Sequence, residues 1–102
     1  MMSAYLIFEF GVTDWEAYRS YSAQAGPLLV RAGAEIVAMS DNATVFEGSK
    51  PGVSAIVRFD SMEQASAFYH GDEYAPLRKL RLDATADHSC IAIPGFVMPA
   101  PP

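Results

Sequence analysis

The sequence of 102 residues predicts one α+β domain with the element order β-α-β-β-α-β. Short segments rich in branched and aromatic residues alternate with segments whose apolar residues recur at helical spacing. The length allows one hydrophobic core, and a composition of 51% hydrophobic and 19% charged residues is typical of a folded chain. We expect residues 1–96 to form this single domain and residues 97–102, "VMPAPP", to form a flexible proline-rich tail.

The first strand and the first helix are predicted from the N-terminal third of the chain. Residues 4–12, "AYLIFEFGV", read as a strand with two largely apolar faces. The helix follows over residues 13–33, opened by Thr13 and Glu16 at the spacing of a capping box. Since proline lacks a backbone N–H and clashes with the preceding turn, we expect a kink or a break at Pro27.

Two further strands are predicted in the middle of the chain. Residues 34–40, "AEIVAMS", form the second strand, and residues 44–48, "TVFEG", return after a turn as a short extension. Residues 53–59, "VSAIVRF", alternate between apolar and polar side chains and form the third main strand.

The last third predicts a helix, a helical insert and a final strand. The helix covers residues 60–71 and is capped by Asp60 or Ser61. The insert, "DEYAPLRKLRLDA", restarts with Asp72 as its cap. Residues 88–96, "HSCIAIPGF", form the final strand.

This order is the ferredoxin-like split β-α-β arrangement, with an antiparallel sheet and helices on one face. Since one helical layer covers only one face, the second apolar face of the first strand needs another cover. A second copy of the sheet is the simplest one, so we expect a homodimer.

Charge and cysteine content narrow the expected partners and location. A formal net charge of -5 would repel phosphate backbones on average, so we expect neither nucleic acid nor a membrane as partner. The single cysteine, Cys90, has no partner for an intrachain disulfide, which fits a reducing compartment. The start lacks a signal-peptide pattern, and no apolar run reaches the roughly 18 residues of a membrane helix. We therefore expect a cytoplasmic protein.

The sequence offers no recognisable metal or cofactor motif. His70, His88 and Cys90 do not form a spaced set of three ligands for zinc or iron. A phosphate loop, a dinucleotide fingerprint and a nucleophile elbow are also missing from the sequence. We expect no metal and no cofactor, although haem needs only one histidine and stays open by this count.

Several segments taken together resemble the DUF1330 family of the dimeric α/β-barrel superfamily, from about residue 4 to 96. The resemblance implies a ferredoxin-like subunit that pairs sheet to sheet in a homodimer, forming a dimeric α/β barrel. The superfamily includes cofactor-independent monooxygenases, muconolactone isomerases and haem-binding members, while the family itself has no established reaction. The matching segments are "AYLIFEFGVTDWEAYRSY", "AGPLLVRAGAEIVA", "FEG" and "VRFDSMEQASAFYHGDEYAPLRKLR".

The polar positions that match the family's motif are the candidate site residues. They are Tyr21 in "YRSY", Glu47 in "FEG", and Tyr74, Arg78 and Arg81 in "DEYAPLRKLR". The chain departs from the motif at His70-Gly71, where a serine-containing turn is more usual.

The spacing of Tyr74, Arg78 and Arg81 at i, i+4 and i+7 places them on one helix face. They are expected at the mouth of a pocket that faces the first helix, where two arginines would hold an anionic ligand. In the alternative interpretation they are a cationic helix end that complements its own dipole.

Tyr18 and Tyr21 are three residues apart on the first helix, so both can offer ring faces and hydroxyl tips to one cavity. In the alternative, the two rings are ordinary half-buried packing. For Glu9 and Arg58 we expect a cross-strand ion pair. In the alternative, Glu9 is a buried carboxylate that acts as a base.

Two function classes remain open from the sequence. The first is a cofactor-independent enzyme, monooxygenase- or isomerase-like, acting on a small anionic or aromatic metabolite. The second is a non-catalytic dimeric module that binds a small ligand or another protein surface, favoured by the lack of a recognisable nucleophile or base.

Overall fold

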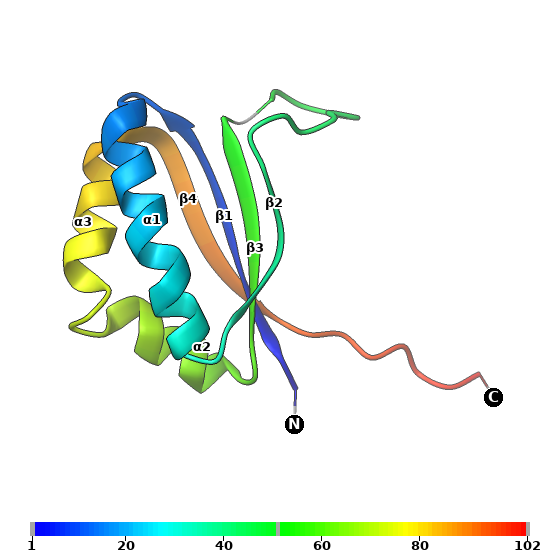
Figure 1. The fold of residues 1–102 in the computed structure, drawn as a ribbon. Coiled ribbons are helices and arrows are strands. Elements are labelled where there is room, and N and C mark those ends of the chain that lie inside the picture. The colour runs from blue at the N-terminus through cyan, green and yellow to red at the C-terminus, as the bar shows by residue number, and fades with distance from the viewer. Residues whose placement is uncertain (1, 51, 102) are drawn as a thin grey trace.

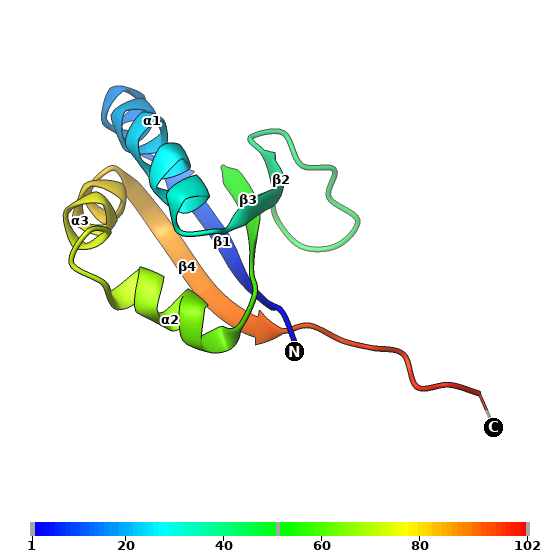
Figure 2. The same cartoon turned by 60° about the horizontal axis from the view of Figure 1, so that its bottom comes forward.

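Figure 1 shows a computed structural model of the chain, which describes residues 2–50 and 52–101. A four-stranded antiparallel sheet has the order β2-β3-β1-β4, and three helices cover one of its faces (Figures 1 and 2). The predicted α+β class and element order are confirmed, with a small helix inserted before the last strand. The elements are β1 (Ala4–Val12), α1 (Trp15–Arg31), β2 (Glu35–Ser40), β3 (Val53–Phe59), α2 (Met62–His70), α3 (Ala75–Asp83) and β4 (Thr85–Pro94).

Helix α1 is continuous. Its N-cap is Asp14, whose carboxylate accepts a hydrogen bond from the Ala17 amide at 3.1 Å, so the predicted start at Thr13 lies one position too early. The helix then runs through Pro27 to Arg31, so of the two predicted outcomes, a kink or a break, the break is wrong. Pro27 is exposed, and water can satisfy the carbonyl that a proline leaves without its helical donor.

The two later helices begin at different signals. The N-cap of α2 is Ser61, one of the two predicted residues, and its hydroxyl accepts from the Gln64 amide at 3.1 Å. The cap position of α3 is Tyr74, without a side-chain capping bond, and Asp72 lies before it in the turn. Pro76 in the first turn of α3 supports the start there, because its missing N–H would have no helical partner.

The segment between β2 and β3 is an exposed loop. The predicted extension strand over residues 44–48 is wrong, because this part of the chain has no strand and extends away from the sheet (Figure 1). Local composition favoured a strand, but a strand also needs a partner edge. The Phe46 side chain is 92% exposed at this point of the loop.

The last strand begins earlier than predicted, at Thr85, whose hydroxyl donates to the Arg81 carbonyl at 2.7 Å. Pairing with β1 shifts register between Glu9 and Gly11. Asp87, with a φ of 51°, lies at this irregularity. Asp tolerates this left-handed conformation better than most residues.

The core lies between the sheet and the helices. Alternate side chains of β1 and β3 point into it, and the helices add aromatic and aliphatic residues. Its large members are Leu6, Phe8, Phe10, Val53, Val57, Phe59, Tyr18, Tyr21, Leu28, Leu29 and Tyr74.

The other sheet face is open and apolar at its centre. Ile7 of β1 pairs with Ile56 of β3 on one side and with Ile91 of β4 on the other, which makes a continuous isoleucine row. Ile91 is 55% exposed. The expected second apolar face of β1 is therefore present, and no described helix covers it.

The predicted ion pair between Glu9 and Arg58 is wrong. The register places Glu9 opposite Ser54 and Arg58 opposite Tyr5, so the two charges lie far apart along their strands. Arg58 instead approaches Asp60 at 3.4 Å.

Within residues 2–50 and 52–101, no helix has both the length and the apolar character that a membrane crossing requires.

Candidate functional site

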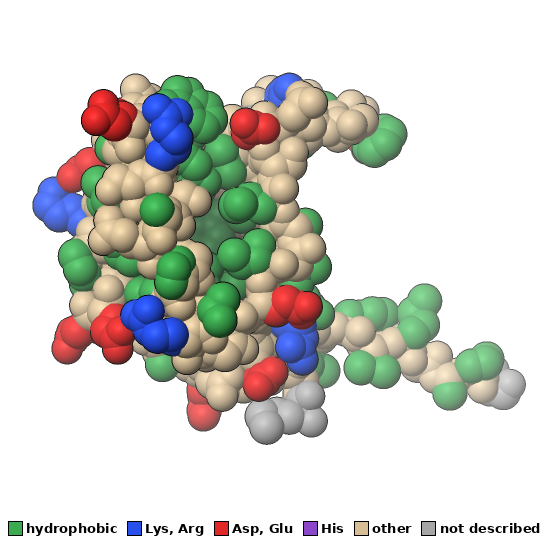
Figure 3. All heavy atoms as spheres, in the orientation of Figure 1, with side chains coloured by type: hydrophobic (Ala, Val, Ile, Leu, Met, Phe, Trp, Pro, Cys, Tyr) green, Lys and Arg blue, Asp and Glu red, His purple; other side chains and the backbone are tan. Residues whose placement is uncertain are grey.

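A cavity lies between α1 and the strands β1, β3 and β2. Figure 3 shows it as a hollow lined with hydrophobic side chains between α1 and the β2 side of the sheet. Its free volume is about 60 Å³, enough for a few water molecules, so a ring compound would also have to occupy the open side toward β2. Its lining comprises Phe8, Phe10, Tyr18, Tyr21, Ser22, Ala25, Gly26, Leu29, Ile36, Met39, Ala55 and Val57.

Small residues on one stripe of α1 create this space. Ser22, Ala25 and Gly26 follow one another at helical spacing and line the cavity. A Cβ atom added at Gly26 would have no neighbour within 4 Å. The opposite wall is formed partly by Ile36 and Met39 of β2, whose side chains are exposed, so the cavity opens on that side.

Arg81 lies in the core, behind Phe8 and Phe10 of the cavity lining. It is 1% exposed, and its guanidinium carbon lies 5.1 Å from the ring centre of Phe8 and 5.8 Å from that of Phe10. Its Nε donates to the Tyr74 hydroxyl at 3.3 Å, while its Nη2 has no hydrogen-bond partner among the described residues. No described carboxylate forms an ion pair with it.

Two phenol hydroxyls connect this arginine to the cavity. The hydroxyls of Tyr74 on α3 and Tyr21 on α1 lie 2.8 Å apart, and Tyr21 lines the cavity. Burial first, and then the neighbouring Tyr74, raise the pKa of Tyr21 well above its ordinary value. Tyr21 therefore keeps its proton at physiological pH and is suited to donate a hydrogen bond rather than to act as a base.

Tyr18 lines the same cavity, and its ring packs edge-on against Phe10 with 5.5 Å between centres. Burial, followed by the charge of Asp41, raises the pKa of Tyr18. The two predicted tyrosines of α1 thus line one cavity together, and their rings are also part of the core.

Arg78 points to a different place from Arg81. Its guanidinium lies 5.3 Å from the ring centre of Tyr69 and donates to the Tyr69 backbone carbonyl in the last turn of α2. A cation there satisfies a free carbonyl and complements the helix dipole. These contacts agree with the dipole interpretation for Arg78, although for a neighbouring helix rather than its own.

Glu47 is not brought to this cavity. It lies in the exposed β2–β3 loop, and no described cation forms an ion pair with it. The structure thus joins Tyr18, Tyr21, Tyr74 and Arg81, and it separates Arg78 and Glu47 from them.

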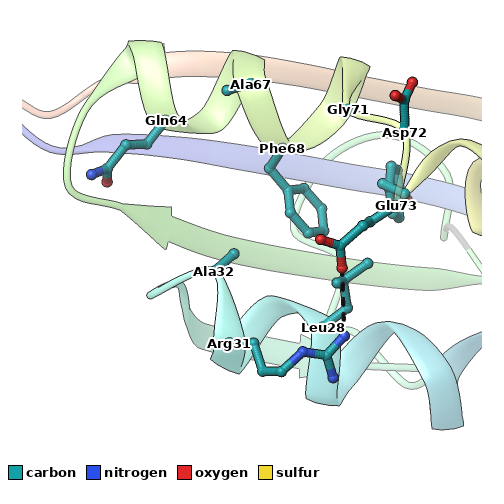
Figure 4. A pocket seen from close by; sticks show the side chains of 10 residues that line it. Leu28, Arg31, Ala32, Gln64, Ala67, Phe68, Gly71, Asp72 and Glu73 are labelled. Atoms are coloured by element: carbon teal, nitrogen blue, oxygen red, sulfur yellow. Dashed lines mark ion pairs between the residues drawn. The ribbon is translucent and has the colours of Figure 1, made fainter.

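A larger cleft of about 500 Å³ lies between the end of α1 and the α2–α3 turn (Figure 4). Arg31 and Glu73 approach each other across it at 3.7 Å, and both are largely exposed. Exposed pairs of this kind contribute little binding energy. Tyr74 lines the inner wall of the cleft, so this residue lies between the cleft and the cavity.

The depth of Arg81 and its contact with Phe8 and Phe10 were missed by sequence reasoning. One signal could have found them. Tyr74, Leu77, Arg81 and Ala84 recur at the spacing of a single buried helix face, so Arg81 occupies a position where an apolar residue is expected.

The described residues contain no group of three His, Cys, Asp or Glu side chains that could hold a metal ion. Cys90 faces the helices beside Leu6 and Tyr69. Burial raises the pKa of its thiol to about 11, and the charge of Arg81 opposes part of that rise.

The fold is that of a ferredoxin-like α+β protein, and solved structures share it. A dimeric protein of unknown function with a ferredoxin-like fold from Bacteroides fragilis is 12% identical with a TM-score of 0.63, covering 89% of this chain and 94% of its own. A protein of unknown function from Rhodopseudomonas palustris is 16% identical with a TM-score of 0.78, covering 95% and 85%. The chain belongs to the DUF1330 family, a domain of unknown function, whose model matches residues 3–96.

A third solved structure, a dimeric ferredoxin-like protein of unknown function from Thermobifida fusca, is 12% identical with a TM-score of 0.63 and covers 90% of each chain. Comparison with curated proteins gives no match.

Proposed function

We propose that the protein is a homodimer that binds a small aromatic metabolite carrying an electron-rich oxygen in the cavity between α1 and the sheet. The observation that carries this proposal is the buried guanidinium of Arg81, which has no carboxylate partner among the described residues and is linked to the cavity by two phenols.

The energetic argument starts from the cost of burying a charge. Several kcal/mol are lost when a guanidinium leaves water without an ionic partner. The two aromatic faces and the single long hydrogen bond return about 1–2 kcal/mol each at most. An apolar residue would stabilise the fold better, so a binding role explains why an arginine stands there.

The cavity wall favours a flat, mostly apolar ligand. Four aromatic rings face it, and the opening toward Ile36 and Met39 leaves room for a substituent to extend outward. Aromatic walls with few polar groups are typical of pockets for small ring compounds.

The homodimer is proposed from the open sheet face. The isoleucine row of β1, β3 and β4 needs a cover, and two solved structures with this fold are described as dimeric. The β2–β3 loop and the chain after Pro94 both extend away from the helices (Figures 1 and 2). They carry the exposed aromatic residues Phe46 and Phe96, which would pack on a second copy.

A thermal-stability screen of small phenols, enols and aromatic acids tests the ligand proposal. We expect hits that raise the melting temperature of the native protein and that no longer do so with Arg81→Met. The matched control is Arg78→Met, which removes a charge from the same helix outside the cavity and should retain the hits. Hits that survive Arg81→Met would contradict the proposal.

Cofactor-independent catalysis, of the monooxygenase or isomerase kind, is the second candidate function. It is favoured by the neutral hydroxyl of Tyr21 at the cavity, since such donors stabilise anionic intermediates. Assaying the hits for conversion separates the two, because binding without turnover would favour the non-catalytic module.

A further inference from the structure

We infer that the cavity selects the ionised oxygen of a phenol or enol, held by a one-way chain of hydrogen-bond donors that runs from Arg81 through Tyr74 to Tyr21. This inference rests on the proposed function and specifies its ligand class.

The direction of the chain follows from counting protons. Arg81 can only donate, so its bond to Tyr74 fixes the Tyr74 oxygen as an acceptor. Tyr74 is 1% exposed, and the one described side-chain oxygen in reach of its own proton is that of Tyr21. Tyr74 therefore donates to Tyr21, because a buried hydroxyl proton without an acceptor is costly.

The proton of Tyr21 is then the free end of the chain. No further hydrogen bond from this hydroxyl exists among the described side chains, and Tyr21 is the member of the pair that lines the cavity. Together with the unpartnered Nη2 of Arg81, the region has donors in excess and lacks an acceptor. The missing partner is an oxygen that only accepts.

The surrounding charges favour an anion at this place. The titratable groups that interact with Arg81 are phenols and a thiol: Tyr18 and Tyr21 of α1, Tyr69 of α2, Tyr74 at the start of α3 and Cys90 of β4. Burial raises the pKa values of Tyr18, Tyr21 and Cys90, so these three side chains are neutral at physiological pH. The carboxylate of Asp41, which follows β2, interacts with Tyr18 and raises its pKa. The chain of donors therefore carries one positive charge, that of Arg81, and no described carboxylate forms an ion pair with it.

The number of donors distinguishes a phenolate from a carboxylate. A carboxylate has two oxygens that accept about four hydrogen bonds, and one hydroxyl at the cavity would leave most of them unsatisfied. A phenolate or enolate has one oxygen, and its charge spreads into a conjugated group that can lie along the aromatic lining of the cavity and extend toward its open side.

Binding of 4-nitrophenol, whose phenolate absorbs visible light, tests this inference. Equilibrium dialysis measures binding, and absorbance measures the ionised fraction at the pH where the free probe is half ionised. We expect bound probe to be at least about 90% ionised, which is a tenfold shift of its acid equilibrium. We also expect 4-nitroanisole, which lacks the ionisable oxygen, to bind at least tenfold more weakly.

Two variants complete the experiment. Tyr21→Phe keeps the ring and removes the last donor, so it should return the bound probe to its ordinary ionisation. Tyr69→Phe removes a phenol hydroxyl outside the cavity lining and should behave like the native protein.

The outcomes separate the inference from the proposed function. Probe that binds in its neutral form, or whose ionisation survives Tyr21→Phe, would overturn the donor chain and leave the binding function standing. Probe that does not bind at millimolar concentration would also overturn the inference, and the metabolite screen would then decide the binding function by itself.

Discussion

The hydroxyl of Tyr21 lies 2.8 Å from the hydroxyl of Tyr74, across 53 positions of sequence. This contact joins α1 to the start of α3 inside the core, where each unsatisfied hydroxyl would cost about 1–3 kcal/mol. The pair therefore fixes the relative placement of the two helices and connects the buried arginine to the cavity. The same two side chains therefore have both a structural role and a proposed binding role.

Replacing Arg81 by methionine should stabilise the protein. Methionine fills a similar volume without a desolvated charge, and replacing buried ionic groups by well-packed apolar residues is often neutral or stabilising by about 1–4 kcal/mol. We expect a higher melting temperature in differential scanning calorimetry, together with loss of ligand-dependent stabilisation. A melting temperature lowered by many degrees would show that Arg81 is a structural residue.

Replacing Arg78 by alanine should lower the stability of the protein and leave ligand binding unchanged, the reverse of the effect expected for Arg81→Met. The substitution removes a hydrogen bond to the last turn of α2 and a contact with the Tyr69 ring, each worth about 0.5–1.5 kcal/mol. We expect chemical denaturation to show a loss of about 1–2 kcal/mol with unchanged ligand affinity. Lys79→Ala is the control, since Lys79 pairs with Asp83 at an exposed site and should cost less than about 0.5 kcal/mol.

Introducing a charge into the isoleucine row should dissociate the proposed dimer. Ile56→Glu places a carboxylate on the open sheet face, where pairing with a second copy would bury it. Light scattering should return the mass of two chains for the native protein and of one chain for the variant. Val30→Glu makes the same change on the exposed side of α1, where Val30 is 70% exposed, and should leave the dimer intact. A native protein that is monomeric at micromolar concentration would refute the proposal.

Gly52 and Gly26 should respond differently to replacement by alanine. At Gly52 a Cβ atom would lie 2.8 Å from the Phe10 carbonyl oxygen and 2.9 Å from the Gly11 Cα, so backbone must move. We expect Gly52→Ala to cost about 1–3 kcal/mol of stability in urea titration. At Gly26 the added methyl meets open space, and the gain in helix propensity offsets the restriction imposed by the following proline. Gly26→Ala should therefore change stability by less than about 1 kcal/mol.

The thiol of Cys90 should react slowly below pH 9. Because the thiolate is the reactive form and burial raises the pKa to about 11, alkylation by iodoacetamide at pH 8 should be at least about tenfold slower than for a cysteine peptide. The same shift predicts lost stability between about pH 9 and pH 11, where the unfolded thiol ionises and the folded one stays protonated. An alkylation midpoint near pH 9 would contradict both expectations.

Much of the fold was predictable because the strands and caps have local signals. The bounds of β1 and β3 match the prediction, since their side chains alternate or cluster over a strand's length. The extension at residues 44–48 failed because branched and aromatic composition measures local preference and not the presence of a partner strand. The start of β4 was missed because Asp87 interrupts the alternation with a left-handed residue.

The candidate site was predictable in its members but not in its depth. Helical spacing shows that Tyr74, Arg78 and Arg81 are near one another, but it does not say which of them turns toward the core. That choice depends on how α3 packs beside α1 and α2, which is a property of the assembled fold. Arginine side chains are usually exposed, so the residue type gave no reason to expect burial at Arg81.

The central position of β1 bears on how the chain is made. This strand pairs with β3 on one edge and with β4, the last described element, on the other, so residues far apart in the sequence must meet. A growing chain on the ribosome can form the β1–β3 pair early, but one edge of β1 stays unpaired until β4 has been made. Pairing between strands that are far apart in the sequence is slow, and until it forms the unpaired edge of β1 can pair with other chains. The nascent domain is thus most vulnerable to aggregation before β4 emerges from the ribosome, when chaperone protection would matter most.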